Sequence, residues 1–282
     1  MNRINLLQRS RRLKLIRRWI PQGLRDCFNR LSGHAIYYRG NYVHWGIART
    51  AAGGYDEASL LKRLAAAAQA VKTGAAAWEQ DGVTHEQIPA DLPLFASLSR
   101  IALAQRGRLS VLDFGGGFGS SYFQCREFLA EVRDLRWGVV EQPQLVDIGR
   151  EHFERDALHF FGTIDEAVTV IQPNVVLLSS VLQYLERPWA VIEKIIATDI
   201  PYLVIDRHPC TLTRELITVQ VIPLSLYSAS YPSWLFDCPR MMARLGYHYE
   251  LLTDWEGKDP PIRGWGKGAE FRGYLLHRRE EI

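Results

Sequence analysis

Four glycines stand within five positions of the chain, directly after a short apolar run that ends in an acid. They are Gly115, Gly116, Gly117 and Gly119, and the run before them is Leu109-Ser-Val-Leu-Asp113. A strand that enters a glycine-rich turn lets a ligand approach bare backbone, because glycine has no Cβ and readily adopts positive φ angles. The spacing fits Asp-x-Gly-x-Gly-x-Gly, which makes room for a bulky ligand built from an amino acid and a nucleoside. A dinucleotide-binding turn needs Gly-x-Gly-x-x-Gly, and Ser120 stands where its last glycine would be.

A second acid stands where the next strand should end. Residues 137–141 read Trp-Gly-Val-Val-Glu, so Glu141 closes an apolar segment 22 residues after Gly119, with Gln142 beside it. A carboxylate in this position can accept hydrogen bonds from two ribose hydroxyls. The alternative for Glu141 is an exposed charge with no ligand.

Three segments resemble the class I S-adenosylmethionine (SAM) methyltransferases, and in particular a family of bacterial methyltransferases associated with surface-polysaccharide genes. They are Val111-Leu-Asp-Phe-Gly-Gly-Gly-Phe-Gly-Ser-Ser-Tyr122, Val140-Glu-Gln142 and Leu177-Leu-Ser-Ser-Val-Leu-Gln-Tyr-Leu185. The similarity also includes Gly54-Tyr-Asp56 and the region from Ile217 to Trp234, hence most of residues 38–276.

The resemblance implies an α/β, Rossmann-like fold with a mostly parallel seven-stranded sheet in the order 3-2-1-4-5-7-6, and SAM as the cofactor. In an open parallel sheet the ligand lies outside the carboxyl ends of the strands. The residues that follow each strand are therefore the candidates for the cofactor site. These are Asp113, Gly115, Gly116, Gly117, Gly119, Glu141, Gln142, Ser179 and Ser180.

Polar side chains follow the fourth apolar run, residues 175–178. We expect Ser179 and Ser180 to line the cofactor pocket and Tyr184 to contact the acceptor. Ordinary caps and turn hydrogen bonds are the alternative for these side chains.

The fifth apolar run is followed by Asp206-Arg207-His208, which puts an acid, a cation and an imidazole together at the mouth of the expected ligand site. A hydroxyl acceptor must lose its proton, and a placed base contributes about 10² to 10⁴ in rate. We expect His208 to be this base because imidazole titrates near neutral pH, with Asp206 as its orienter or as an alternate base and Arg207 as an acceptor contact. The alternative is a structural Asp206–Arg207 ion pair with His208 on the surface.

Residues 217–236 carry aromatic side chains among Ser, Ala and Pro. Sugars and other amphipathic acceptors stack on aromatic faces, so Tyr231 and Trp234 are candidate acceptor contacts on a loop that closes over the site. Packing in the core is the alternative.

From residue 109 onward apolar strands alternate with helices, the pattern of a parallel sheet with right-handed crossovers. We expect strands at 111–113, 138–141, 159–161, 175–178 and 202–206, and an antiparallel terminal pair at 247–253 and 272–277. Three regions follow from this pattern. They are a basic N-terminal arm (1–33), a helical cap region (34–107) with helices beginning at Asp56 and Asp91, and a SAM-binding domain (108–282).

The composition, 47% hydrophobic and 23% charged over 282 residues, is sufficient for a core without metal or disulfide support. The four cysteines, at positions 27, 125, 210 and 238, are dispersed with no Cys-x-x-Cys pair. We therefore expect reduced thiols, a cytoplasmic location and no metal site.

Positive charge is concentrated at the N-terminus. Residues 1–30 hold nine Lys and Arg residues and one Asp, a net charge of +8, which leaves −5 for the rest of a chain whose total is +3. The folded body is therefore not expected to bind nucleic acid. Apolar residues interleave with the arginines over residues 4–20, so peripheral contact with an anionic membrane is a hypothesis beside that of a flexible or docked arm.

We expect a SAM-dependent methyltransferase that methylates a hydroxyl of a small-molecule or saccharide acceptor, such as a cell-envelope precursor. The acceptor class follows from the resemblance alone. Two alternatives are a catalytically silent SAM-fold binding protein and, less favoured because of Ser120, a nicotinamide-dependent oxidoreductase.

Overall fold

The structure is a computed structural model that describes residues 36–54, 57–80, 82–155, 157–222, 229–259, 262 and 269–280. The basic arm of residues 1–33 and Asp56, the expected start of the first helix, lie outside these ranges. Within them, no helix combines the length and the apolar composition that crossing a membrane requires.

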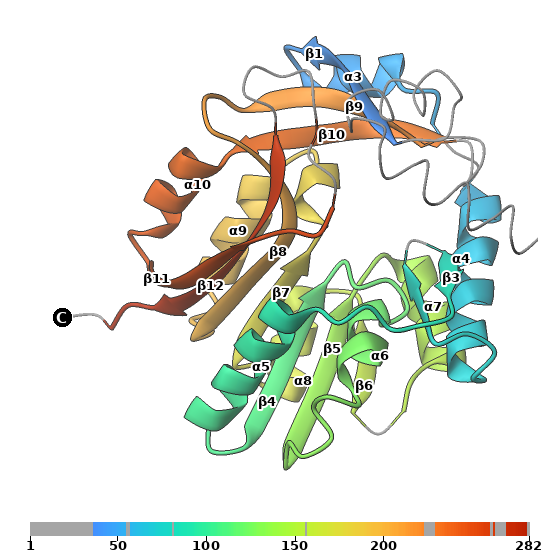
Figure 1. Ribbon diagram of the computed structural model, residues 1–282, viewed down its shortest axis with the longest axis vertical. Coiled ribbons are helices and arrows are strands. Elements are labelled where there is room, and N and C mark those ends of the chain that lie inside the picture. Colours follow the sequence, from blue (N-terminus) through green and yellow to red (C-terminus); the bar gives the residue numbers. More distant parts are fainter. Residues whose placement is uncertain are drawn as a thin grey trace, which may run out of the picture.

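A parallel sheet forms the centre of the molecule, as the alternation of strands and helices predicted (Figure 1). Its strands are β4 (Arg108–Phe114), β5 (Asp134–Val140), β6 (Leu158–Phe161), β7 (Val175–Ser179) and β8 (Tyr202–Thr211). Next to β8 lies β12 (Glu270–Arg278), antiparallel, and β11 (Tyr249–Glu256) pairs antiparallel with β12. Seven strands follow the expected order 3-2-1-4-5-7-6 as β6-β5-β4-β7-β8-β12-β11, but the whole sheet has ten strands and not the expected seven.

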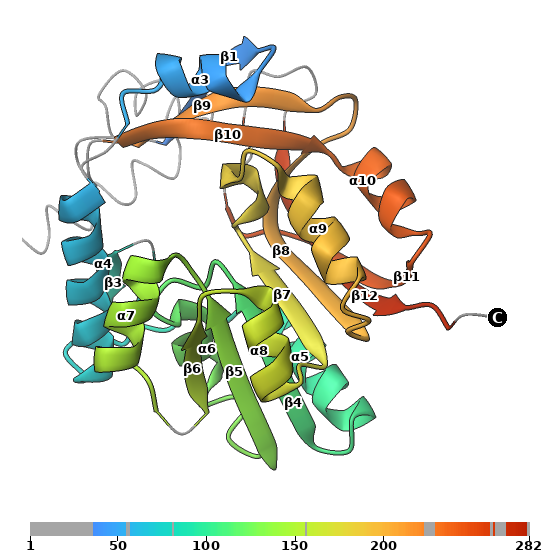
Figure 2. The ribbon, with the colours of Figure 1, turned by 180° about the vertical axis from the view of Figure 1, so that it is seen from behind.

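Helices cover both faces of this sheet because alternate strand residues point to opposite sides. Leu109 and Val111 lie in the cluster that buries α5, α6 and α7, whereas Leu112 lies in the cluster that buries α8, α9 and α10 (Figures 1 and 2). The helices are α5 (Leu92–Ala104), α6 (Ser120–Cys125), α7 (Pro143–His152), α8 (Ile164–Ile171), α9 (Pro188–Ile196) and α10 (Cys238–Leu245).

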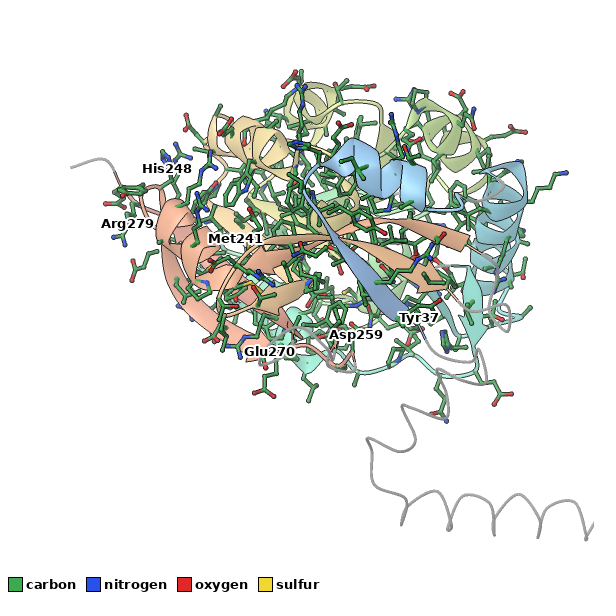
Figure 3. The ribbon with its side chains drawn as sticks, turned by 90° about the horizontal axis from the view of Figure 1, so that it is seen from above. Tyr37, Met241, His248, Asp259, Glu270 and Arg279 are labelled. Carbon is green, nitrogen blue, oxygen red and sulfur yellow. A yellow bond between two sulfur atoms is a disulfide. The ribbon has the colours of Figure 1, made fainter. Side chains whose placement is uncertain are left out.

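Three antiparallel strands, which the sequence pattern did not predict, extend the sheet beyond the end of β8. They are β1 (Tyr37–Tyr42), β9 (Leu216–Ile222) and β10 (Ala229–Asp237). Phe236 of β10 pairs with Cys210 of β8, β10 pairs with β9, and β9 pairs with β1. The helix α3 (Trp45–Ala51) covers the outer face of this β1–β9–β10 layer. The layer lies across the carboxyl ends of the parallel strands in Figures 1 and 2, and Figure 3 looks down on it.

Two expectations about these segments are wrong. Residues 34–107 are not helical throughout, since besides α3, α4 (Glu57–Lys72) and α5 they contain β1 and the hairpin of β2 (Trp78–Gln80) with β3 (Val83–His85). The aromatic segment 217–236 contributes β9 and β10, and is not a closing loop over its described residues. Both differences come from long-range pairing, because β9 offers β1 an edge of backbone donors and acceptors that no local pattern encodes.

Cys210 at the end of β8 and Cys238 at the start of α10 form a disulfide, with Cα atoms 5.3 Å apart. Cys125 is free and buried. The expectation of reduced thiols is wrong for Cys210 and Cys238, because the pairing of β10 with β8 brings together these two cysteines, which are 28 positions apart. The inference from dispersed cysteines to a reducing compartment falls with it.

Reduction of this disulfide is expected to lower the free energy of unfolding by about 3 to 4 kcal/mol, since a cross-link over a loop of this length restricts the unfolded chain. Urea unfolding with and without dithiothreitol measures the difference. The double variant Cys210→Ser/Cys238→Ser should not respond to dithiothreitol. Alkylation of both cysteines in unreduced, urea-unfolded protein would contradict the cross-link.

Candidate active site

A cavity of about 420 Å³ lies at the carboxyl ends of β4 and β7 and beside the middle of β8. Its lining comes from the glycine loop after β4, the residues after β7, the middle of β8, the β2–β3 hairpin, the start of α5 and the loop after β11. Distant parts of the chain thus meet at the edge where an open parallel sheet binds its ligands. Its polar lining includes Ser179, Ser180, Asp206, Arg207, Lys258 and Asp259.

The glycine loop turns bare backbone toward this cavity. Gly117 has a φ of 58°, and a Cβ built there meets no heavy atom within 4 Å, so the absence of a side chain keeps that space open. A Cβ on Gly116 would lie 2.5 Å from Asp113 Oδ2, so the loop backbone passes directly over the carboxyl group. Gly115 also lines the cavity, whereas Gly119 is the N-cap residue of α6. The predicted glycines therefore form a single turn at the end of β4.

Asp113 lies beneath this turn and is only 1% exposed. Trp137 Nε1 donates to Asp113 Oδ2 at 3.0 Å. Burial raises the pKa of Asp113 to about 7, an effect that the Trp137 hydrogen bond opposes and the nearby Glu141 increases. A cation in the cavity would favour the ionised form. The charge of Asp113 therefore depends on what the cavity holds.

Glu141 is brought to the glycine loop, as expected from its place after β5. Its Oε1 accepts from the Gly117 N–H at 3.2 Å and its Oε2 from the Gln142 N–H at 3.0 Å. Burial raises the pKa of Glu141, and these two backbone hydrogen bonds work against the shift. Gln142 is the N-cap residue of α7 and its side chain makes no capping hydrogen bond. The ribose role of Glu141 and Gln142 stays a prediction, now with the carboxylate beside the loop.

Asp206 of β8 is one of the carboxylates that line the cavity. Ser179 Oγ donates to its Oδ2 at 3.0 Å, and Trp255 Nε1 donates to its Oδ1 at 3.3 Å. Burial raises the pKa of Asp206 to about 6, the negative charge of Asp91 adds to this, and Arg207 and the two hydrogen bonds lower it. Asp206 thus has a fixed orientation and a pKa near the working range of a general base.

Ser180 and Arg207 hold left-handed backbone conformations beside Asp206, with φ angles of 55° and 54°. The Ser180 N–H donates to the Asp206 carbonyl at 2.9 Å, so the residue after β7 lies beside the part of β8 that contains Arg207. Such conformations cost about 1 to 3 kcal/mol each and cluster at functional sites. This strain supports a functional role for the end of β7 and the middle of β8.

The position of His208 corrects its expected role as base. His208 is 0% exposed and does not line the cavity. Its Nδ1 lies 2.8 Å from the Asp206 carbonyl oxygen and its Nε2 accepts from the Leu182 N–H at 3.2 Å, so the first nitrogen carries the proton and both are engaged. Burial lowers the pKa of His208 to about 3. His208 therefore holds the turn after β7 and cannot exchange a proton with a cavity ligand.

Arg207 is placed at the cavity, where its Nε donates to Asp259 Oδ2 at 3.1 Å. Lys258 Nζ lies 3.7 Å from Asp91 Oδ2. Acids outnumber cations on the described lining: the cations are Arg207 and Lys258, and the acids are Glu79, Asp91, Asp113, Asp206 and Asp259. The cavity therefore favours a cationic or neutral ligand over an anionic one.

The predicted aromatic contacts separate into two groups. Trp234 stacks on Trp45 at 5.8 Å between ring centroids and donates its indole N–H to the Leu185 carbonyl at 2.8 Å, so it packs the layer against the turn after β7. Tyr184 and Tyr231 form an edge-to-face pair with centroids 5.2 Å apart. Tyr184 follows Ser180 closely in the chain and Tyr231 comes from β10, and neither tyrosine is part of the cavity lining.

Sequence reasoning missed several residues that line the cavity or contact its lining. Asp91 was recognised as a helix cap, which it is, with Oδ1 accepting from the Leu94 N–H at 3.3 Å, but not as a cavity residue. Asp259, Lys258 and Trp255 come from the terminal strands and their loop, and no local pattern marks them. Trp78 and Glu79 of the short strand β2 also line the cavity, and this pair of a large aromatic and a charged residue was the only local hint in the sequence of a polar cavity wall there.

The contribution of Asp113 and Asp206 to the free energy of unfolding of the ligand-free protein is expected to fall as pH rises from about 4 to about 7, whereas that of His208, whose pKa is lowered, changes in the opposite direction. The folded-state pKa values of Asp113 and Asp206, about 7 and about 6, exceed the ordinary value of 3.8. The folded state therefore binds these protons more tightly, an advantage that is complete below the unfolded pKa and lost as pH rises through the folded values. For Asp113 the effect is on the order of 4 kcal/mol.

Urea unfolding of the wild type and of Asp113→Asn between about pH 4.5 and pH 7.5 measures this dependence. The variant should lose less stability over that interval, and the exposed-site variant Asp165→Asn should behave as the wild type does. Equal slopes for Asp113→Asn and the wild type would contradict the raised pKa.

No protein-family model and no curated protein matches this chain. It is similar to the solved structure of NodS, an N-methyltransferase from Bradyrhizobium japonicum WM9 in complex with S-adenosyl-L-homocysteine (SAH), with 11% identity over 67% of this chain and 87% of that one and a TM-score of 0.40. It is also similar to the N-terminal domain of EvdMO1 with SAH bound, with 12% identity over 80% of this chain and 98% of that one and a TM-score of 0.46. A third similar structure is SAM-bound CalS10, an amino pentose methyltransferase from Micromonospora echinaspora involved in calicheamicin biosynthesis. The identity is 14% over 68% of this chain and 92% of that one, and the TM-score is 0.40. At these TM-scores the likenesses assign neither a cofactor nor a substrate to this chain.

Proposed function

We propose that this protein is a SAM-dependent methyltransferase whose acceptor is a hydroxyl of a saccharide or another small cell-envelope precursor. The observation that carries the cofactor is the meeting of the glycine loop with Glu141, in which the Gly117 N–H donates to the carboxylate at 3.2 Å. The open space at Gly117 suits the amino-acid part of SAM, and the adjoining carboxylate suits its ribose. The saccharide rests on the resemblance to methyltransferases associated with surface-polysaccharide genes.

The charge of the cavity supports SAM over a nicotinamide dinucleotide. SAM carries a sulfonium and an ammonium group against one carboxylate, so its net charge is positive. A dinucleotide would bring a diphosphate into a cavity lined by more acids than cations, and the two cations, Arg207 and Lys258, already lie beside Asp259 and Asp91. Like charges at such a site oppose binding. The acceptor is for the same reason proposed to be neutral or cationic near the methylated atom.

Each residue has a part in this proposal. When bound, SAM supplies a methyl group on a sulfonium for transfer to a nucleophile. Asp206 accepts the proton of the acceptor hydroxyl, because it lines the cavity and its pKa is about 6. Ser179 and Trp255 orient its two oxygens, and Arg207 contacts the acceptor. Alignment of donor and acceptor supplies up to about 7 to 11 kcal/mol, and the base about 10² to 10⁴ in rate.

Two measurements test this function. Isothermal titration with SAM and with NAD separates the two ligand classes, and binding of NAD but not of SAM would refute the proposal. Incubation of methyl-labelled SAM with the protein and a cell-envelope extract, followed by identification of the labelled product, tests catalysis. SAM binding without any labelled product would favour the silent binding protein instead.

A further inference from the structure

Tyr38, Gln220 and Tyr231 lie side by side on one face of the β1–β9–β10 layer. The strand register pairs Gln220 with Tyr38 of β1 and with Tyr231 of β10. Directly opposed residues of antiparallel strands point to the same face. The alternate residue Val219 packs against Ala48 of α3, so Gln220 and the two tyrosines are on the face away from α3. On that face Tyr38 packs against a cluster that contains Leu216 of β9 and Leu235 of β10.

Tyr184 joins this face to the cavity. It belongs to the turn η1 (Leu182–Tyr184) directly after β7, it is 37% exposed, and its ring meets Tyr231 edge-to-face. The residue before it, Gln183, donates from Nε2 to Ser180 Oγ at 2.7 Å, and Ser180 lines the cavity. The aromatic face and the cavity are therefore connected through a single turn.

Two amide oxygens here are buried without a hydrogen-bond partner. They are Oε1 of Gln220, a residue that is 5% exposed, and Oε1 of Gln183, which is 1% exposed. Buried carbonyl oxygens are nearly always hydrogen-bonded, and an unsatisfied acceptor destabilises the fold that contains it. Acceptors kept unsatisfied next to aromatic rings fit a ligand that brings its own hydroxyl donors.

We propose that Tyr38, Tyr184, Tyr231 and the amide of Gln220 form a saccharide-binding subsite. A pyranose has an apolar face of C–H groups that packs on tyrosine rings and an edge of hydroxyls, one of which donates to Gln220 Oε1. The subsite holds a sugar ring of the acceptor while the hydroxyl to be methylated reaches Asp206. This inference rests on the proposed function for its biological sense, but sugar binding is measured without any methyl transfer.

Saturation-transfer NMR with four neutral probes tests the subsite on the full-length protein in the presence of SAH. The probes are the methyl glycosides of rhamnose, mannose, galactose and N-acetylglucosamine. At least one glycoside is expected to bind, and Tyr184→Ala and Tyr231→Ala should each weaken that binding by at least about fivefold. The matched control is Tyr37→Ala, because Tyr37 (labelled in Figure 3) pairs with Val221 and so lies on the α3 side of the same strand as Tyr38. It should bind the glycoside as the wild type does.

Gln220→Met separates a binding role from a structural one. It removes the unsatisfied oxygen at nearly constant size, so thermal stability should rise while glycoside binding falls by at least about fivefold. Unchanged glycoside binding in this variant or in both tyrosine variants would overturn the proposal. So would the failure of all four glycosides, or equal binding of cyclohexylmethanol, which has a similar ring and a single hydroxyl. Titration with SAM is run on every variant, so loss of the proposed function and loss of the subsite give different results.

Discussion

Valine at position 117 is expected to weaken SAM binding by at least about 100-fold while the chain stays folded. A Cβ at Gly117 meets no protein atom within 4 Å, so the isopropyl group of Gly117→Val enters the space proposed for the cofactor. A 100-fold loss corresponds to about 2.7 kcal/mol of binding free energy. The positive φ adds a cost of about 1 to 2 kcal/mol for any residue with a Cβ, but this cost falls on folding. Isothermal titration with SAM measures the first effect and urea unfolding the second.

Gly74→Val is the control for that substitution. Gly74 follows α4, has a φ of 78°, has open space where a Cβ would stand, and does not line the cavity. It therefore carries the same kind of backbone strain without entering the cofactor space, and its SAM affinity should stay within about twofold of the wild type. Wild-type affinity in folded Gly117→Val would refute the loop as the cofactor site. Equal losses in both variants would assign the effect to general destabilisation.

The glycine loop and the sheet around it could be predicted because their signals are local. An apolar run that ends in Asp113 followed by a glycine turn marks a strand and the turn after it within a few positions. The order of the parallel strands followed from the resemblance, and the alternation of strands and helices supports it. The place of Glu141 beside the loop followed from the same logic, since it closes the next apolar segment in the chain, and its ribose role stays a prediction.

His208 was misplaced because β8 does not end at Asp206. The strand continues to Thr211, since β12 pairs with His208 and β10 with Cys210. Its register shifts opposite Gly273, where Arg207 takes a φ of 54°. A bulge of this kind re-aims the side chains around it. Asp206 therefore reaches the cavity while His208, two residues on, is buried in the core.

Gly273 shows why such an irregularity escapes sequence reasoning. A Cβ at Gly273 would lie 2.0 Å from the Trp255 ring, so this glycine leaves room for the indole that donates to Asp206. The orientation of the carboxylate thus depends on a glycine and a tryptophan from the terminal strands. Each is unremarkable in its own segment, and only the three-dimensional pairing relates them.

Asp206→Asn is expected to lower the rate of methyl transfer by about 10² to 10⁴, the usual contribution of a general base. Asparagine keeps the size of the side chain and can still accept a hydrogen bond from Ser179 or Trp255, so the affinity for SAM should change little. The wild-type rate should rise with pH and level off above about 6, because the pKa of Asp206 is raised to about 6 and only the ionised carboxylate accepts a proton. The variant should have lost this rise. Label incorporation from methyl-labelled SAM into envelope extract between about pH 5 and pH 8 measures both.

Asp91→Asn is the matched control, because it removes one carboxylate charge from the same cavity and asparagine still caps α5. Asp91 raises the pKa of Asp206, so this variant should keep the plateau rate and shift the midpoint of the pH profile to lower pH. An Asp206→Asn protein with more than about a third of the wild-type rate would exclude Asp206 as the base. If Asp91→Asn and Asp206→Asn lost rate equally, cavity charge and not proton transfer would be the cause.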